Sequence, residues 1–174
     1  MKRLTLSILS ALCVTLVFPI AFANYDLLTL VIIQDDLGVQ EALTAGADVN
    51  MRDDYGNTPL TTAAIYSNDA TLFKILLAAG ADIEARDARG LTPLLIAIDS
   101  VLFGHDDDLE RIQVLLDASA NPNARDTGQT AWHGTYDLTP LDFSILGQDD
   151  PEASASPLGN FNETMRLLRE AVGP

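Results

Sequence analysis

The histidines and a run of aspartates are the side chains of this chain that could do acid–base or metal chemistry. His105 and His133 are its only histidines, and neither stands in a hydrolase or metal-site motif. The run Asp106–Asp108 lacks the alternating carboxylate spacing of a calcium loop. The single cysteine, Cys13, has no second thiol to pair with. These patterns favour no catalytic site, no bound metal and no cofactor.

Three further aspartates are candidate acids because they recur at the same place in a repeated segment: Asp53, Asp87 and Asp126. An aspartate at the start of a turn can accept hydrogen bonds from the backbone N–H groups that follow it. A catalytic acid is needed once, whereas this aspartate returns in every copy. We therefore expect a structural role for all three and no enzymatic activity.

The segments that would position these side chains repeat along the chain. Ala45–Val49 returns 34 positions later as Ala79–Ile83, and Thr58–Leu60 returns as Thr92–Leu94. A looser third copy consists of Ala118–Asn121, Arg125–Asp126 and Thr139–Leu141. A fixed period of this length is typical of solenoid proteins, in which each unit packs only on its neighbours.

Each copy carries start and stop signals for a pair of helices. Thr58 can cap a helix in which Pro59 occupies the first position. Gly46 and Gly80 stand where the second helix of a pair must end in a left-handed residue. Ser119 replaces this glycine in the third copy, so we expect that turn to be strained or altered.

A period near 33, with Thr-Pro-Leu opening one helix and Gly-Ala-Asp closing the other, resembles the ankyrin repeat. The resemblance implies an all-α fold, an ankyrin-repeat solenoid of stacked helix-turn-helix pairs with projecting β-hairpin loops, about three to four repeats including degenerate caps. It covers nearly all of the chain after residue 23 and is best over residues 45–99. It also implies that His105, which follows Gly104, is a structural turn residue between two helices.

The N-terminal segment, 1–23, is expected to be a signal peptide. Basic residues at positions 2 and 3 precede an apolar run from Leu4 to Ile20, and Ala21–Ala23 has small residues where a signal peptidase reads. We expect cleavage after Ala23 and, from the short bacterial-type signal, a periplasmic location. A retained membrane anchor is the alternative, and acylation of Cys13 is a minor one.

The remainder, residues 24–174, is expected to form a single domain. It divides into an N-terminal capping pair (24–47), a repeat (48–81), a repeat with an extended loop between its helices (82–120), and a C-terminal repeat with a long hairpin and a mobile loop (121–174). The capping pair is expected to present two apolar faces. These consist of Leu27, Leu28, Val31 and Ile32 in one helix and of Leu37, Val39 and Leu43 in the other.

Acidic residues dominate the charge of the chain. Its formal net charge is −15, and removal of Lys2 and Arg3 with the signal would make it −17. Such a field repels nucleic acid and anionic lipid headgroups and speeds encounter with cationic partners. It also favours solubility. We therefore expect no nucleic-acid binding, no membrane insertion after cleavage, and a monomer that binds a protein with a basic surface.

The third hairpin departs from the pattern. Between the recurring landmarks Arg125 and Thr139 it is longer by eight positions than the hairpin between Arg86 and Thr92. The insertion carries the only tryptophan, Trp132, and aromatic residues on loops of a rigid scaffold are common binding hot spots. The alternative is that Trp132 folds back to shield the end of the stack.

The resemblance also implies where a partner binds, because ligands of ankyrin-like proteins generally meet the hairpin tips and the inner-helix face. On the first tip these residues are Asp54, Tyr55 and Asn57, and on the second Ala88, Arg89 and Leu91. On the extended third tip they are Gln129, Trp132, His133, Tyr136 and Asp137. The inner-helix candidates are Thr61, Ile65 and Tyr66.

Export, acidity and the lack of catalytic groups indicate a non-enzymatic periplasmic binding protein. The chain also resembles small exported bacterial ankyrin proteins, some of which are immunity proteins that block antibacterial effectors, including lipases. This resemblance implies the leading hypothesis, an immunity protein that captures and neutralises a secreted effector. Others of these proteins assist periplasmic stress enzymes such as catalase, which is the alternative. A third alternative is an envelope-attached scaffold.

Overall fold

Helices account for the regular structure of the described part of the chain, as the repeat pattern predicts. The computed structural model describes residues 26–67, 69–102, 108–125, 139 and 158–173, and no β-strand occurs in these ranges. The helices of the described residues are α2 (Leu27–Ile32), α3 (Asp36–Thr44), α4 (Pro59–Tyr66), α5 (Ala70–Ala78), α6 (Pro93–Leu102), α7 (Asp108–Asp117) and α9 (Leu158–Val172). The all-α fold class is confirmed.

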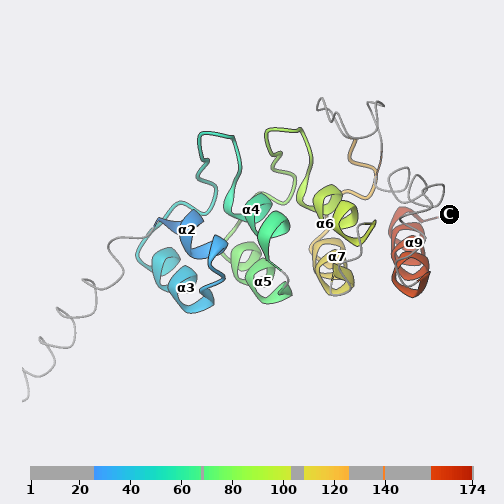
Figure 1. The fold of residues 1–174 in the computed structure, drawn as a ribbon, viewed down its shortest axis with the longest axis horizontal. Coiled ribbons are helices and arrows are strands. Elements are labelled where there is room, and N and C mark those ends of the chain that lie inside the picture. The colour runs from blue at the N-terminus through green and yellow to red at the C-terminus, as the bar shows by residue number, and fades with distance from the viewer. Residues whose placement is uncertain (1–25, 68, 103–107, 126–138, 140–157, 174) are drawn as a thin grey trace, which may run out of the picture.

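The helices stack as pairs in two rows (Figure 1). In the inner row α4 packs between α2 and α6, while α3, α5, α7 and α9 contact one another in order along the outer row. Within a pair, α2 packs on α3, α4 on α5 and α6 on α7. The loops before α4 and α6 project beyond the inner row on the same side. This is the predicted solenoid.

Each projecting loop is a hairpin closed by few backbone hydrogen bonds. In the first, the Asp53 N–H donates to the carbonyl of Asn57 at 3.1 Å. In the second, the Asp87 N–H donates to the carbonyl of Leu91 at 3.0 Å. Each tip turns through a glycine with a positive φ, which is 79° at Gly56. The described hairpins therefore lack the strand ladder that their predicted β-hairpin shape suggests.

The start of α4 confirms the predicted helix cap. The N–H of Thr61 donates to the Thr58 hydroxyl at 3.3 Å, and the N–H of Thr58 donates to the Thr61 hydroxyl at 2.7 Å. Pro59 occupies the first helical position, where its missing N–H leaves no intrahelical hydrogen bond unmade. Thr58 and Thr61 thus form a reciprocal capping box in which a threonine replaces the usual glutamate.

Outer helices end in left-handed residues, as the sequence predicts. Gly46 and Gly80 have φ values of 96° and 89°. Ser119 takes the same conformation, with φ 71°, although it carries a Cβ. The N–H of Ala120 still donates to the carbonyl of Leu115 at 2.9 Å, so the turn geometry is kept and the strain falls on Ser119.

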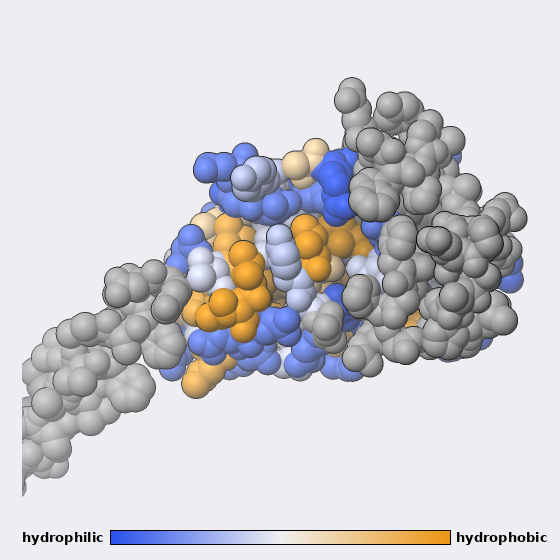
Figure 2. Space-filling model, viewed as in Figure 1, coloured by the Kyte–Doolittle hydropathy of each residue, from blue (hydrophilic) through white to orange (hydrophobic). Residues whose placement is uncertain are grey.

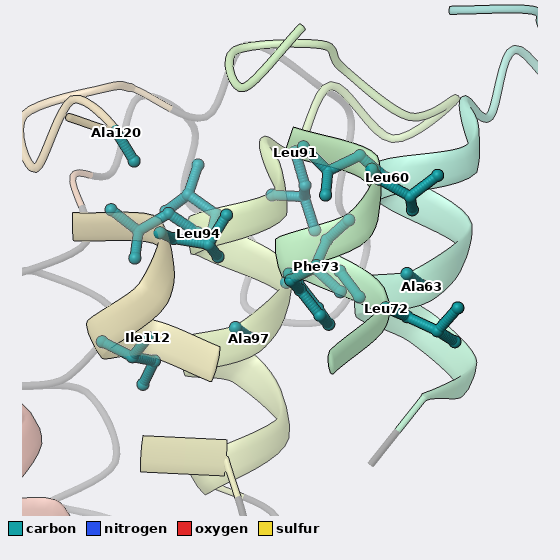
Figure 3. Packing of buried hydrophobic residues seen from close by; sticks show 14 of the residues in the cluster. Leu60, Ala63, Leu72, Phe73, Leu91, Leu94, Ala97, Ile112 and Ala120 are labelled. Atoms are coloured by element: carbon teal, nitrogen blue, oxygen red, sulfur yellow. The ribbon is translucent and has the colours of Figure 1, made fainter. Parts of the chain in front are cut away.

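One hydrophobic core runs through the stacked pairs (Figure 3). Its alanines, such as Ala63 and Ala97, are fully buried and let adjacent inner helices approach closely. Side chains that fill the space between pairs include Leu60, Leu72, Phe73, Leu94 and Ile112. The first pair is a partial exception. Ile32 and Leu37, which were expected in its apolar faces, are 47% and 61% exposed and lie outside the core. Their equivalents one repeat later, Tyr66 and Thr71, are exposed as well, so these positions face solvent in the stack.

An arginine occupies a core position of the third pair. Arg111 stands in α7 where α5 has Leu72 when the ends of the two helices are aligned, and it is 2% exposed. Its Nη1 donates to the carbonyl of Ser67, and its guanidinium carbon lies 5.9 Å from the centroid of the Phe73 ring. Arg111 therefore ties α7 to the preceding pair by a hydrogen bond and a cation–π contact.

Replacing Ser119 by glycine should stabilise the protein. A left-handed conformation costs an L-residue about 1–2 kcal/mol, and the more flexible unfolded chain of a glycine variant offsets part of the relief. We expect Ser119→Gly to raise the free energy of unfolding by up to about 1 kcal/mol in urea titrations. Gly80→Ser is the reverse control, since no atom lies within 4 Å of a Cβ added there. An unchanged or lowered stability of Ser119→Gly would contradict this account of the turn.

Candidate binding surface

The first hairpin tip is shaped by Asp53. Its Oδ1 accepts the N–H groups of Tyr55 at 2.9 Å and of Asn57 at 2.7 Å, and its Oδ2 accepts the Asn57 amide at 2.9 Å. The predicted structural role of this aspartate is thus confirmed. Tyr55 is 74% exposed and Asp54 is exposed beside it, whereas the Asn57 amide is already engaged. Tyr55 and Asp54 are therefore the tip residues that a partner can reach.

In the second tip an aspartate again accepts the backbone N–H groups of the turn, but different tip residues are exposed. Asp87 is buried and accepts the N–H groups of Arg89 and Leu91, each at 2.9 Å, and the Arg89 Nε at 2.8 Å. Ala88 is exposed and Arg89 half-buried. Leu91 is 1% exposed because it points into the core, so its assignment to the binding surface was wrong.

Two arginines hold the hairpins in register. The Arg52 Nη1 donates to the carbonyl of Gly56 in its own hairpin at 2.6 Å and to that of Arg86 in the next at 2.9 Å. The Arg86 Nη1 repeats this with Gly90 at 2.6 Å and Arg125 at 2.7 Å. Sequence reasoning noted that the arginine recurs but missed this role. An arginine that returns at the same place in each repeat could have indicated a structural contact between successive hairpins.

On the inner row, the end of α4 is open to solvent. Ile65 and Tyr66 are 37% and 53% exposed, in agreement with their prediction as surface residues. Thr61 is fully buried and its hydroxyl takes part in the helix cap, so its assignment to the binding surface was wrong. The start of α4 therefore faces the core, and only its last turn is available to a partner.

The adjoining end of α2 adds two residues that sequence reasoning missed. Ile32 and Ile33 are 47% and 56% exposed. Gln34 follows them with a φ of 57°, and its Nε2 donates to the carbonyl of Tyr66 at 3.0 Å. Because α2 packs on α4, these residues lie beside the end of α4. The signal was present, since Ile32 and Tyr66 occupy equivalent positions one repeat apart.

We call the four exposed apolar residues Ile32, Ile33, Ile65 and Tyr66 the inner patch. Figure 2 shows hydrophobic residues gathered in the middle of the visible face, between hydrophilic hairpins and a hydrophilic band below. The patch ends at α6, where Asp99 and Ser100 stand one repeat after Ile65 and Tyr66. Among the side chains that the structure describes, the patch thus belongs to the ends of α2 and α4.

Three carboxylates border the inner patch. Asp35 caps α3 and Asp36 is its first residue, while Asp69 caps α5 by accepting the Thr71 N–H at 2.8 Å. Burial, followed by repulsion from Asp69 and Asp35, raises the pKa of Asp36. Hydrogen bonds from Thr71 lower the pKa of Asp69. The two acids next to Asp36 thus make its charged form less favourable, which a nearby cation would reverse.

Several predicted features lie outside the described residues. They are the third-tip candidates Gln129, Trp132, His133, Tyr136 and Asp137, together with His105 and Asp126. Within the described part of the chain, no group of three metal-ligating side chains converges, and no helix is long and apolar enough to cross a membrane. A shallow depression on the outer row is lined by Leu37, Gln40, Glu41, Thr44 and Ala45.

Leu91 and Tyr55 provide a direct test of this division between core and surface. Leu91→Ala should lower the free energy of unfolding by about 2–4 kcal/mol, because it opens a cavity in the shared core. Tyr55→Ala should change it by no more than about 0.5 kcal/mol, since most of the ring is in water. Denaturant unfolding measures both values. Equal losses for the two variants would show that the first tip also packs into the fold.

The comparison with protein families agrees with the geometry. A family model described as ankyrin repeats, in three copies, matches residues 28–133. No curated protein sequence matches the chain. The matched region covers more than half of the chain and includes the stacked pairs from α2 to α7. The chain belongs to the ankyrin repeat family.

Proposed function

We propose that this protein is a non-enzymatic binding protein that captures one protein partner outside the cytoplasm and neutralises it. Ankyrin repeats generally mediate protein–protein interaction. The observation that carries the proposal is the inner patch, four exposed apolar side chains on the surface of a packed solenoid. A contiguous apolar surface rimmed by polar residues is typical of an interaction site.

The charge of the chain favours a basic partner. A net charge of −15 attracts cationic surfaces and raises the rate of encounter with them. An immunity protein needs rapid capture of its effector, so acidity supports this role. The proposed partner is a secreted antibacterial effector with a basic surface, for example a lipase. The signal-like residues 1–23 support a periplasmic location.

Affinity capture tests the proposed partner class. The tagged protein is used to recover partners from periplasmic extract, and each is identified by mass spectrometry and retested in purified form. We expect a secreted hydrolase whose activity falls when the purified protein is added. Recovery of only a housekeeping enzyme of oxidative stress, such as catalase, would contradict the immunity role and favour the accessory role.

The contribution of Tyr66 to partner binding can be measured with the same purified pair. Tyr66→Ala should weaken binding by about 2 kcal/mol or more in calorimetry, the usual threshold for a hot-spot residue. Leu37→Ala is the matched control, because Leu37 is apolar and 61% exposed but lies on α3 outside the inner patch. Trp132→Ala tests the third tip in the same assay. A loss confined to Trp132→Ala would move the binding site to that tip.

The mass of the exported chain tests the proposed location. A chain cleaved after Ala23 begins at Asn24 and lacks both basic residues of the amino terminus. We expect this mass in the soluble periplasmic fraction of cells that express the full sequence. Recovery of the full-length chain in the membrane fraction would support an envelope-attached scaffold instead.

A further inference from the structure

The apolar character of the inner patch has no structural cause in the solenoid. Ile65 and Tyr66 stand in the last turn of α4, and the corresponding residues of α6 are Asp99 and Ser100. Because α6 forms in the same row with polar residues there, the fold does not require apolar side chains at these positions. Tyr66 and Ile33 are also more than half exposed, so they contribute little to the core.

The patch is held as one surface. Gln34 links the end of α2 to the Tyr66 carbonyl at 3.0 Å, and α2 packs on α4. The solenoid core beneath them includes Val31 and Ala64, both fully buried. A partner therefore meets a preformed apolar surface, which reduces the conformational entropy lost on binding.

Negative charge borders this surface on the side of the outer helices. Asp35 follows Gln34 directly, and Asp36 and Asp69 stand at the starts of α3 and α5, which pack on each other. Two cations near this cluster have partners of their own. Lys74, which helps to lower the pKa of Asp69, pairs with Glu110 at 2.8 Å, and Arg111 donates to the Ser67 carbonyl. Within the described part of the chain, no salt bridge joins Asp35, Asp36 or Asp69 to a basic side chain.

From these contacts we infer that the inner patch and the carboxylates Asp35, Asp36 and Asp69 together bind a segment of the partner in which apolar side chains are flanked by lysine or arginine. This inference rests on the proposed protein-binding function and deepens it. The apolar side chains cover Ile32, Ile33, Ile65 and Tyr66, and each flanking cation meets a carboxylate at the border. Burial supplies affinity, while the charges supply orientation and rate.

The charge argues against other occupants of the patch. A second copy of the chain would bring another −15 charge and the same three carboxylates to the contact. An anionic membrane surface would be repelled for the same reason. A protein segment with both apolar and basic side chains can cover the inner patch and also pair with the carboxylates at its border.

A pair of fluorescent peptides tests this inference. One combines leucine with lysine and the other combines leucine with glutamate in the same order. Binding to the purified protein is followed by fluorescence polarisation. We expect binding of the lysine peptide, weakened by rising salt, and no measurable binding of the glutamate peptide. Equal binding of both peptides would overturn the role of the carboxylates.

Paired variants separate the patch from general acidity. Ile33→Ser with Tyr66→Ser should weaken the lysine peptide at least about tenfold, because apolar burial is lost. Asp36→Asn with Asp69→Asn should weaken it and reduce its salt dependence, while asparagine can still cap α5. Asp48→Asn with Asp117→Asn removes the same charge from sites elsewhere on the surface and should have a smaller effect. Circular dichroism verifies that each variant is folded.

The outcomes distinguish this inference from the proposed function. If the serine pair binds the lysine peptide as wild type does, or if both asparagine pairs act equally, the inference fails even when a partner is captured from the periplasm. If the peptide binds through the patch but no periplasmic partner is recovered, the proposed function fails and the surface chemistry stands. Self-association abolished by the serine pair in sedimentation would assign the patch to a second copy and overturn the inference.

Discussion

The packing of each helix pair against its neighbours is the interaction on which the rest of this structure depends. A single pair leaves one apolar face uncovered, so α4 and α5 are stable only between the pairs on either side. Fully buried Ala63 and Ala97 set the close approach of the inner helices, and Phe73 fills the space beside them. The stability of every exposed feature therefore comes from contacts along the stack.

Polar contacts fix the spacing that the core alone leaves adjustable. Arg52 and Arg86 each join their own hairpin to the next one, and Asn50 joins its turn to the following repeat through the Asp82 N–H at 2.7 Å. Such bonds are directional, whereas apolar contacts are not. The hairpins and the inner helices thus keep a constant relation, which makes a binding surface spread over two repeats possible. The inner patch is such a surface.

Individual positions show which features of the fold could be predicted from the sequence and which could not. The helix cap at Thr58, the left-handed Gly80 and the turn role of Asp53 were predicted because each depends on residues within a few positions. Thr61 was placed on the surface and Leu91 on a tip, yet both are buried. Their burial follows from how neighbouring pairs approach, and a repeat pattern alone does not contain that distance.

The sequence by itself determined the repeat, the order of the helices and the turns between them, because these follow from local backbone preferences and a regular period. Only the tertiary structure decided which apolar residues remain uncovered. Ile32 and Leu37 match the apolar pattern of a core face but lie on the sides of α2 and α3 that face away from the core. Likewise, the inner patch and its carboxylates come together because α2 and α4 stack, which places equivalent residues of successive repeats side by side.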